Sequence, residues 1–253
     1  MISTAKTNRF IKKEKRKAKR KKVVFYFFIL IIIGGLVYLF AFSPIFKIKS
    51  IDISGNRNIP SEEIISNLQN RNIFLTTKSS IKNQLIKKFP EILDLKLSKN
   101  LFKRELHIEI IEREAIGILC AEDKCFYFDK DGIVFGSTSA NSEGTTIIVK
   151  DYSDRNYNLG DKVFDKNLID NILSIKNELA SKLDLGVSSF DIDTYPIEEL
   201  RVVTNESWYI LFNLKNNIKS QLSALEVALN EKIQNRSALQ YIDLRIENRI
   251  YYK

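Results

Sequence analysis

The residues that most often carry chemistry are scarce in this sequence. His107 is the only histidine among 253 residues, and its alternation with Leu106 and Ile108 predicts an exposed position on a strand. A catalytic triad would need this histidine beside a nucleophile and an orienting acid, and no nucleophile motif is present. One histidine and two cysteines also do not favour a four-ligand zinc site built from such side chains.

The two cysteines have a structural interpretation. Cys120 and Cys125 flank residues 121–124, which are expected to form a turn between two strands. In an oxidising exterior the two thiols would form a disulfide across that hairpin. The alternative is a pair of small buried residues without a bond, and the sequence leaves both interpretations open.

The paired acids of the chain are also better explained by structure than by catalysis. Asp129-x-Asp131-Gly132 begins like a calcium loop but lacks the remaining ligands, so a turn is expected there. Asp191 and Asp193 alternate with hydrophobic residues, which predicts that both acids lie on the solvated face of a strand. No Gly-rich phosphate loop is present. We therefore expect no catalytic residue, no metal site and no cofactor, and we do not expect an enzyme.

The formal charge of +9 is concentrated at the N-terminus. Residues 1–22 contain 11 lysines and arginines and a single acid, Glu14, whereas the remaining residues contain 29 basic and 30 acidic groups. A folded region so close to neutrality has no general field for polyanions, which argues against nucleic acid as its ligand. The basic tail, residues 1–22, needs another explanation.

Residues 23–42 form an uncharged apolar run directly after that tail. About twenty helical residues, each rising ~1.5 Å, cross ~30 Å of hydrocarbon, so the run predicts a transmembrane helix. A cleavable signal peptide is the alternative, because Ala41-Phe42-Ser43 has small residues at the right spacing. The apolar run is longer than a usual signal sequence, which favours an uncleaved anchor. The positive charges before it predict a cytoplasmic N-terminus that contacts anionic lipid headgroups, with residues 43–253 outside the cytoplasm.

Residues 45–114 predict a small folded domain. Hydrophobic residues between Phe46 and Ile53 indicate a strand, and a helix is expected to follow with Pro60 at its start and Ser61 as its cap. A second helix is expected from about Thr77 to Pro90, and alternating residues at 92–99 and 104–113 indicate two more strands. The expected order is β-α-α-β-β.

Residues 115–253 predict a second domain with a mixed β-sheet and two helices. Strands are expected around a hairpin at 126–135, at 147–149, 187–192, 199–203 and 208–214, and in a final strand from 242 to 253. Helical periodicity indicates helices at 163–183 and 219–233. The fold class is therefore α+β behind a single transmembrane helix.

Several short motifs carry a family resemblance. The strand that ends in Gly55-Asn56 resembles the opening of a POTRA domain, and the run 110–113 resembles its closing strand. The hairpin with Asp129 and Gly132, together with Ile-Asp-Leu-Arg at 242–245, is similar to signatures of the FtsQ/DivIB family of bacterial cell-division proteins. Ile246 departs from that pattern, because an aromatic residue is usual there.

The resemblance implies a function. FtsQ-type proteins are single-pass scaffolds of the divisome, located in the cell membrane at the division septum. The family implies that their outer domains connect small bitopic proteins of the FtsB/FtsL type with septal peptidoglycan synthases. It also implies that the C-terminal strand receives such a partner.

The last strand of the chain is the expected partner-binding site. Arg249, Ile250, Tyr251 and Tyr252 lie in it, and an uncovered edge strand offers backbone groups for strand addition. The alternative is that these four residues only complete the sheet. One alternative function is that of a POTRA component of protein translocation, but residues 115–253 are too few to form a large barrel. The other is a membrane-anchored envelope enzyme, which would need a deep pocket with convergent ionisable groups.

Overall fold

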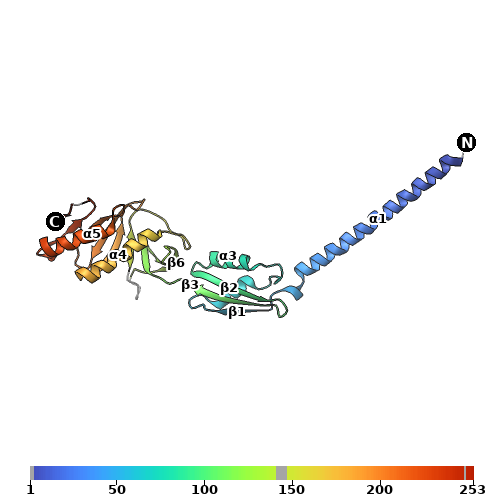
Figure 1. The fold of residues 1–253 in the computed structure, drawn as a ribbon. Helices are drawn as coiled ribbons and strands as arrows, with labels where there is room; N and C mark the ends of the chain where they lie inside the picture. Colours follow the sequence, from blue (N-terminus) through green and yellow to red (C-terminus); the bar gives the residue numbers. More distant parts are fainter. Residues whose placement is uncertain (1–2, 141–146, 248) are drawn as a thin grey trace. The chain divides into compact units, whose positions relative to one another are not determined.

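The structure of the chain is a computed structural model that describes residues 3–140, 147–247 and 249–253 (Figure 1). It divides into two compact units. The first comprises Met1–Gln84 and Leu95–Ile110, and the second comprises Leu85–Asp94 and Ile111–Lys253.

Helix α1 (Ser3–Phe42) contains the predicted membrane segment. Its portion Lys22–Phe42 has 21 residues with a mean hydropathy of 2.8, and its side chains are not buried against protein. Within the described residues it is the one helix that is long and apolar enough to cross a membrane. The predicted contact between the basic tail and lipid headgroups concerns residues 1–22, and the side chains of residues 1–21 lie outside what the structure describes.

The segment after α1 has the predicted β-α-α-β-β order. Its elements are β1 (Ser50–Ser54), α2 (Ser61–Leu68), α3 (Lys78–Lys88), β2 (Ile92–Asn100) and β3 (Glu105–Glu112). Within the described residues the three strands form a sheet in the order β1-β3-β2, in which β1 runs parallel to β3. Several hydrophobic residues of the predicted periodic patterns are buried, among them Ile64, Leu68, Ile81, Leu106 and Ile108.

Two local predictions for this segment are wrong. The strand expected from Phe46 begins only at Ser50, because Pro44–Phe46 forms a short 3-10 helix, η1. The residue that caps α2 is Pro60, not Ser61, and Pro60 makes no side-chain capping bond. Ser61 instead accepts a hydrogen bond from Asn56 Nδ2 at 3.0 Å, so its hydroxyl fastens the preceding turn.

The second unit contains a large mixed sheet. Its strands are β4 (Gly117–Ala121), β5 (Lys124–Phe128), β6 (Val134–Thr138), β7 (Ile148–Asp151), β8 (Val187–Ile192), β9 (Glu199–Thr204), β10 (Tyr209–Asn213), β11 (Tyr241–Asp243) and β12 (Tyr251–Tyr252). Across the described residues the order is β12-β11-β10-β9-β8-β7-β4-β5-β6. The β4–β7, β7–β8 and β10–β11 pairs are parallel, and the remaining pairs are antiparallel.

Two helices of the second unit contribute to its core (Figure 1). Helix α4 (Lys166–Leu183) starts three residues later than predicted because Asp165 caps it, accepting a hydrogen bond from Leu168 N at 2.7 Å. Helix α5 (Ile218–Val227) is followed by a π-helical turn, η2 (Ala228–Lys232), and a 3-10 turn, η3 (Arg236–Ala238). Both helices contribute buried leucines and isoleucines to the core that the sheet also lines.

Strand register places alternate side chains in two rows across the sheet. One row belongs to the hydrophobic core and comprises Leu119, Val149, Phe190, Val202, Ile210 and Ile242. The neighbouring row points to the opposite face, because successive side chains of a strand alternate. It comprises Cys120, Lys150, Asp191, Arg201, Leu211 and Asp243.

The prediction of a solvated face for Asp191 is wrong. Asp191 is buried, because it lies in a central strand in register with Lys150 on one side and Arg201 on the other. Ser189 Oγ donates a hydrogen bond to Asp191 Oδ1 at 2.7 Å. Burial raises the pKa of the Asp191 carboxyl above its ordinary value, and the hydrogen bond from Ser189 opposes that shift only in part. Asp193 does lie at the surface, 2.6 Å from Arg201.

The final strand is also different from the prediction. The run 242–253 is not one strand but two: β11 ends at Asp243, and β12 begins at Tyr251. The two pair antiparallel, with Ile242 opposite Tyr252. The connection between them contains Leu244, which is buried, and Leu244 N still donates to Leu211 O of β10 at 2.9 Å.

Candidate partner-binding edge

Strand β12 is an edge of the large sheet among the described residues. Lys253 exchanges hydrogen bonds with Tyr241, from Lys253 N to Tyr241 O at 3.2 Å and from Tyr241 N to Lys253 O at 3.4 Å. In an antiparallel pair such residues alternate with residues whose backbone groups point away from the partner strand. The N–H and C=O groups of Tyr252 therefore point away from β11, toward the side where an added strand would pair.

The structure places the four predicted residues at this edge, in different environments. Tyr251 and Tyr252 form β12, with 45% and 52% of their surfaces exposed. Arg249 is exposed in the preceding connection, whereas Ile250 is partly buried against the hydrophobic core. Ile250 thus attaches the edge to the domain, and the two tyrosines and Arg249 are available to a partner.

An arginine clamp holds the neighbouring strand β11. Arg245 Nε and Nη2 donate to the two carboxylate oxygens of Asp243 at 2.9 and 2.7 Å, and Nη1 donates to Glu199 Oε2 at 2.7 Å. The hydrogen bonds from Arg245 hold the pKa of the Asp243 carboxyl below its ordinary value, although partial burial opposes the shift. Because Asp243 lies opposite Tyr251 in the strand register, the clamp fixes the strand on which β12 pairs.

Two aromatic rings lie on the same face of the sheet as Asp243, two residues earlier in strands β10 and β11. Tyr209 and Tyr241 are stacked, with ring centroids 5.7 Å apart and an interplanar angle of 18°. The Arg201 guanidinium lies 5.3 Å from the Tyr209 ring centre, and Arg201 also pairs with Asp193. Stacked tyrosines and a planar cation are the residue types that most often anchor protein–protein contacts.

A small cavity of about 160 Å³ lies beside the edge. It is bordered by the start of α5 and by the connection between β11 and β12. Ile246 contributes to its rim with 53% of its surface exposed. In the sequence, Ile246 stands out only as a departure from an aromatic position. The cavity has no signal in the sequence, because it forms between segments about thirty residues apart.

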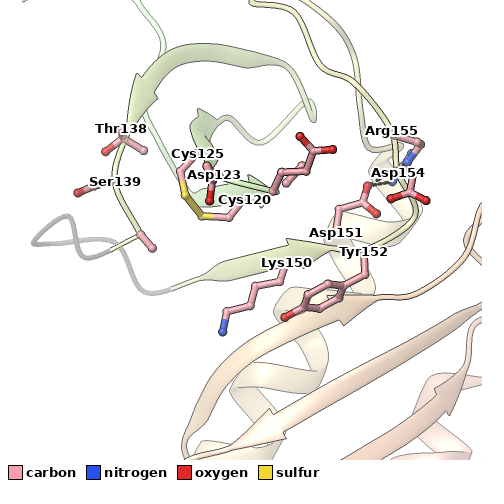
Figure 2. A pocket seen from close by; sticks show the side chains of 13 residues that line it. Cys120, Asp123, Cys125, Thr138, Ser139, Lys150, Asp151, Tyr152, Asp154 and Arg155 are labelled. Atoms are coloured by element: carbon pink, nitrogen blue, oxygen red, sulfur yellow. Dashed lines mark hydrogen bonds and ion pairs between the residues drawn. A yellow bond between two sulfur atoms is a disulfide. The ribbon is translucent and has the colours of Figure 1, made fainter.

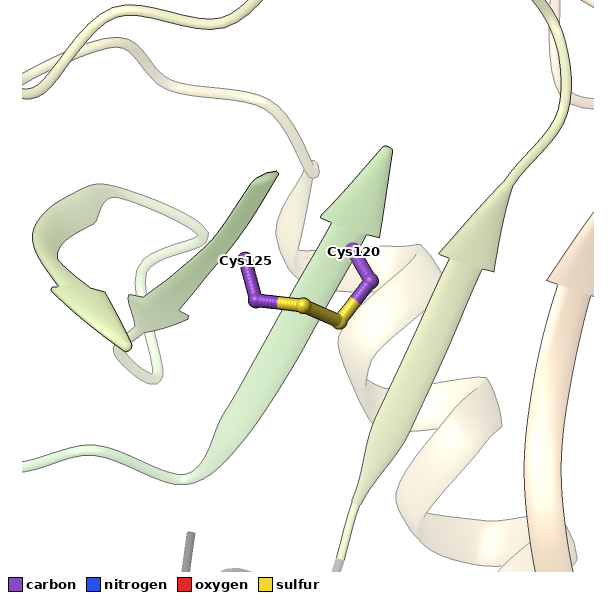
Figure 3. Close-up of a disulfide and its surroundings, with 2 residues drawn as sticks. All are labelled: Cys120 and Cys125. Atoms are coloured by element: carbon purple, nitrogen blue, oxygen red, sulfur yellow. A yellow bond between two sulfur atoms is a disulfide. The ribbon is translucent and has the colours of Figure 1, made fainter. Parts of the chain in front are cut away.

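The two cysteines are joined by a disulfide in the structure (Figure 3). Cys120 on β4 lies directly opposite Cys125 on β5, and Glu122 takes a left-handed conformation with φ of +50° in the two-residue turn. The disulfide borders a hollow of about 600 Å³, which Figure 2 shows together with Lys150 and Asp151.

Two of the charged residues around this hollow, Asp151 and Arg155, pair with each other. Asp151 is buried and accepts hydrogen bonds from Ser153 N at 2.8 Å, from Arg155 Nη2 at 2.7 Å and from the Tyr157 hydroxyl. Burial alone would raise the pKa of Asp151, but the hydrogen bonds from Ser153 and Tyr157 and the charge of Arg155 outweigh it and leave the pKa below its ordinary value. Among residues 3–140, 147–247 and 249–253, no group of three or more potential ligand side chains is arranged to hold a metal ion.

The remaining predicted positions are structural. His107 lies on the exposed side of β3, and its Nδ1 is 2.7 Å from Asp52 Oδ2 at the surface. Asp129 forms the predicted turn: its Oδ1 accepts hydrogen bonds from Asp131 N and Ile133 N, both at 3.0 Å. Gly132 follows with φ of +75°, a conformation that favours glycine.

The sequence did not reveal that Asp129 is also half of a buried ion pair. Arg113 Nη1 lies 2.5 Å from Asp129 Oδ2, and the two side chains are only 9% and 3% exposed. Arg113 Nε also donates to Pro90 O at 2.9 Å. These three residues belong to the second unit. Nothing in the local pattern around Arg113 indicates a partner sixteen residues away.

Comparisons with known proteins agree with this fold. Residues 46–113 match the family model described as "POTRA domain, FtsQ-type". The chain is 29% identical to the "Cell division protein DivIB" of Clostridium tetani over 169 residues, which cover 65% of this chain and 62% of that protein. It is 32% identical to the protein of the same name from Clostridium botulinum over 158 residues, 60% of this chain and 57% of the relative.

A third relative is matched over a longer range. The DivIB protein of Clostridium acetobutylicum is 26% identical over 223 residues, which cover 86% of each chain. The matches to the first two relatives span about three fifths of the relatives' own lengths.

The part of the chain that the structure describes is a POTRA-containing α+β protein with one candidate membrane-spanning helix before the POTRA domain. Its second domain is a mixed sheet with two helices. Its POTRA domain is of the FtsQ type, and the matches to three proteins named DivIB support the FtsQ/DivIB family.

Proposed function

We propose that this protein is a bitopic scaffold of the bacterial division machinery. The apolar helix anchors it in the cell membrane at the septum, with the N-terminus in the cytoplasm and the folded domains, residues 45–114 and 115–253, outside. It binds small bitopic division proteins of the FtsB/FtsL type and connects them with septal peptidoglycan synthases. It makes and breaks no covalent bond.

The observation that carries this proposal is the edge at β12. The outward backbone groups of Tyr252 and the exposed rings of Tyr251 and Tyr252 provide what strand addition requires, which is an unpaired edge and side chains for specificity. The relationship to proteins named for cell division supports the choice of partner class. The Arg245 clamp supports the same site, because it fixes β11 before any partner binds.

A substitution at Tyr252 separates the contribution of the backbone from that of the side chain. Tyr252→Pro removes an N–H group that points away from β11, and an edge position tolerates proline better than a central one. Tyr252→Ala keeps the N–H group and removes the ring. Tyr152→Ala is the matched control, because Tyr152 is 56% exposed and lies outside this edge.

The assay is co-purification of the tagged full-length chain with co-expressed small bitopic division proteins. We expect Tyr252→Pro to abolish recovery of the partner, Tyr252→Ala to reduce it, and Tyr152→Ala to leave it unchanged. Full recovery with Tyr252→Pro would exclude the edge as the binding site. A fluorescent fusion that stays evenly distributed around dividing cells would contradict the division role itself.

A further inference from the structure

Five apolar side chains are exposed near the end of α1 where the first folded unit begins. They come from three segments that are distant in sequence: η1, the loop between α2 and α3, and the turn between β2 and β3. Phe102 has no contact that covers it, since its exposure reaches 102%. The other four side chains are 42% to 68% exposed. We call the five residues together the apolar tip: Ile45, Phe74, Leu75, Leu101 and Phe102.

Side-chain contacts attach the first two segments to the end of α1. Asn72 Nδ2 donates to Phe40 O at 2.7 Å, so the loop before Phe74 is attached to the last turn of α1. The rings of Phe40, Phe46 and Phe74 form a cluster with centroid distances of 4.7 to 5.7 Å. Phe40 lies within the segment Lys22–Phe42, so the apolar tip continues the apolar surface of the candidate membrane span.

The third segment is attached to the same place. Arg104 Nη1 donates to Ile45 O at 2.9 Å, and Lys49 N donates to Arg104 O at 2.9 Å. Residue 45 is three positions after the end of α1. Phe102 is two residues before Arg104, so the β2–β3 turn is held near the point where the chain leaves the span.

The three segments that carry the apolar tip have charged residues of one sign. Residues 43–50, 70–78 and 99–104 contain seven lysines and arginines and no acid. They are Lys47, Lys49, Arg71, Lys78, Lys99, Lys103 and Arg104. Apolar side chains surrounded by cations are typical of protein surfaces that lie at the boundary between anionic headgroups and acyl chains.

We propose that the apolar tip docks on the lipid bilayer, in the leaflet at the Phe42 end of the span. Phe102, Leu101 and Phe74 enter the headgroup–acyl boundary, and the surrounding lysines and arginines contact lipid phosphates. The occupant is lipid because the surface is continuous with the membrane segment and complementary to anionic headgroups. Docking would hold the first folded unit against the membrane, and it does not depend on the role proposed for β12.

A fluorescent probe at Lys103 tests the docking without removing Phe102. The full-length Lys103→Cys variant is labelled with an environment-sensitive dye and reconstituted in vesicles of phosphatidylethanolamine and phosphatidylglycerol. Glu62→Cys is the matched control, because Glu62 is exposed at the start of α2 and belongs to the same unit. The unsubstituted protein serves as the labelling blank, since Cys120 and Cys125 are bonded to each other.

We expect lipids with a quencher near the headgroup to quench the dye at position 103 but not at position 62. Adding Phe102→Ser to the Lys103→Cys variant should lower the ratio of docked to undocked protein on the order of tenfold, given the transfer free energy of one aromatic ring. Because Phe102 is uncovered, this substitution leaves the folded unit intact. Val227→Ser, another exposed apolar position, should leave the quenching unchanged.

Three results would overturn the proposal. No lipid quenching at position 103, with the dye still quenched by aqueous iodide, would show that the tip stays in water. Equal quenching at positions 62 and 103 would show that lipid does not select the tip. Protection of position 103 from aqueous iodide without lipid quenching would show that the tip contacts a second protein copy instead of lipid.

Discussion

The buried pair of Arg113 and Asp129 gives the sharpest test of how the second unit is stabilised. Both side chains are almost fully buried, and Asp129 also accepts the backbone N–H groups of Asp131 and Ile133. Arg113→Met would remove the cation but keep much of the apolar stem. It would leave a buried carboxylate without its partner, which costs about 3–5 kcal/mol of unfolding free energy.

The double variant distinguishes the loss of the pair from the loss of packing. Asp129→Asn keeps an oxygen that accepts the two backbone hydrogen bonds and removes the charge. Added to Arg113→Met, it should recover part of the lost stability, because it removes the buried charge that has lost its partner. The second substitution should therefore be stabilising in the Arg113→Met background.

The assay uses Trp208, which is the only tryptophan and is 1% exposed in the core of the same unit. Its fluorescence reports urea unfolding of the full-length chain in detergent micelles, independently of the apolar helix. With a denaturant slope of about 2 kcal/mol per molar urea, Arg113→Met should lower the unfolding midpoint by about 2 M. The reasoning is refuted if Arg113→Met costs less than about 1 kcal/mol, or if the double variant is no more stable than the single one.

Two further predictions use the same unfolding measurement. Replacing Cys120 and Cys125 by alanine should lower the unfolding free energy by about 2 kcal/mol, because this is the loop-closure entropy that a disulfide across so short a loop removes from the unfolded chain. Reductant should have the same effect on the wild type but none on the variant. Burial raises the pKa of Asp191, so the native state binds this proton more tightly than the unfolded state, and its contribution to stability declines as the pH rises above about 4. Asp191→Asn retains an acceptor for Ser189 Oγ and should therefore have a higher unfolding free energy than the wild type near neutral pH. The difference in unfolding free energy should disappear at about pH 4, and an equal difference at both pH values would contradict this prediction.

The sequence predicted the features that depend on local periodicity. The apolar run of α1 and the alternation in β3 needed only a short window, and each matches the structure. Asp191 shows where such a window is insufficient. Alternation indicates which residues share a face, but whether the second face is solvated depends on the neighbouring strands, and β8 lies in the interior of a large sheet.

A final strand at the C-terminal end was predictable, but its bounds and contacts were not. Tyr251 and Tyr252 were expected in a final strand, but the break after Asp243 was not, because Leu244 and Ile250 continue the hydrophobic pattern while the chain turns. The contact between Arg245 and Glu199 and the cavity near Ile246 join segments far apart in sequence. Such contacts have no signal in a single sequence.

The shortness of β12 limits what its backbone can contribute. A strand of two residues offers few outward hydrogen-bonding groups, and each bond adds only about 0.5–1.5 kcal/mol net in water. An unrelated extended peptide, or the same edge of a second molecule, would therefore gain little by pairing there, and short edges of this kind protect soluble sheets from aggregation. If the edge binds a partner as proposed, durable recognition requires a ligand that also fits the tyrosine rings and the cavity near Ile246, and the small size of the edge would then restrict which proteins can bind there.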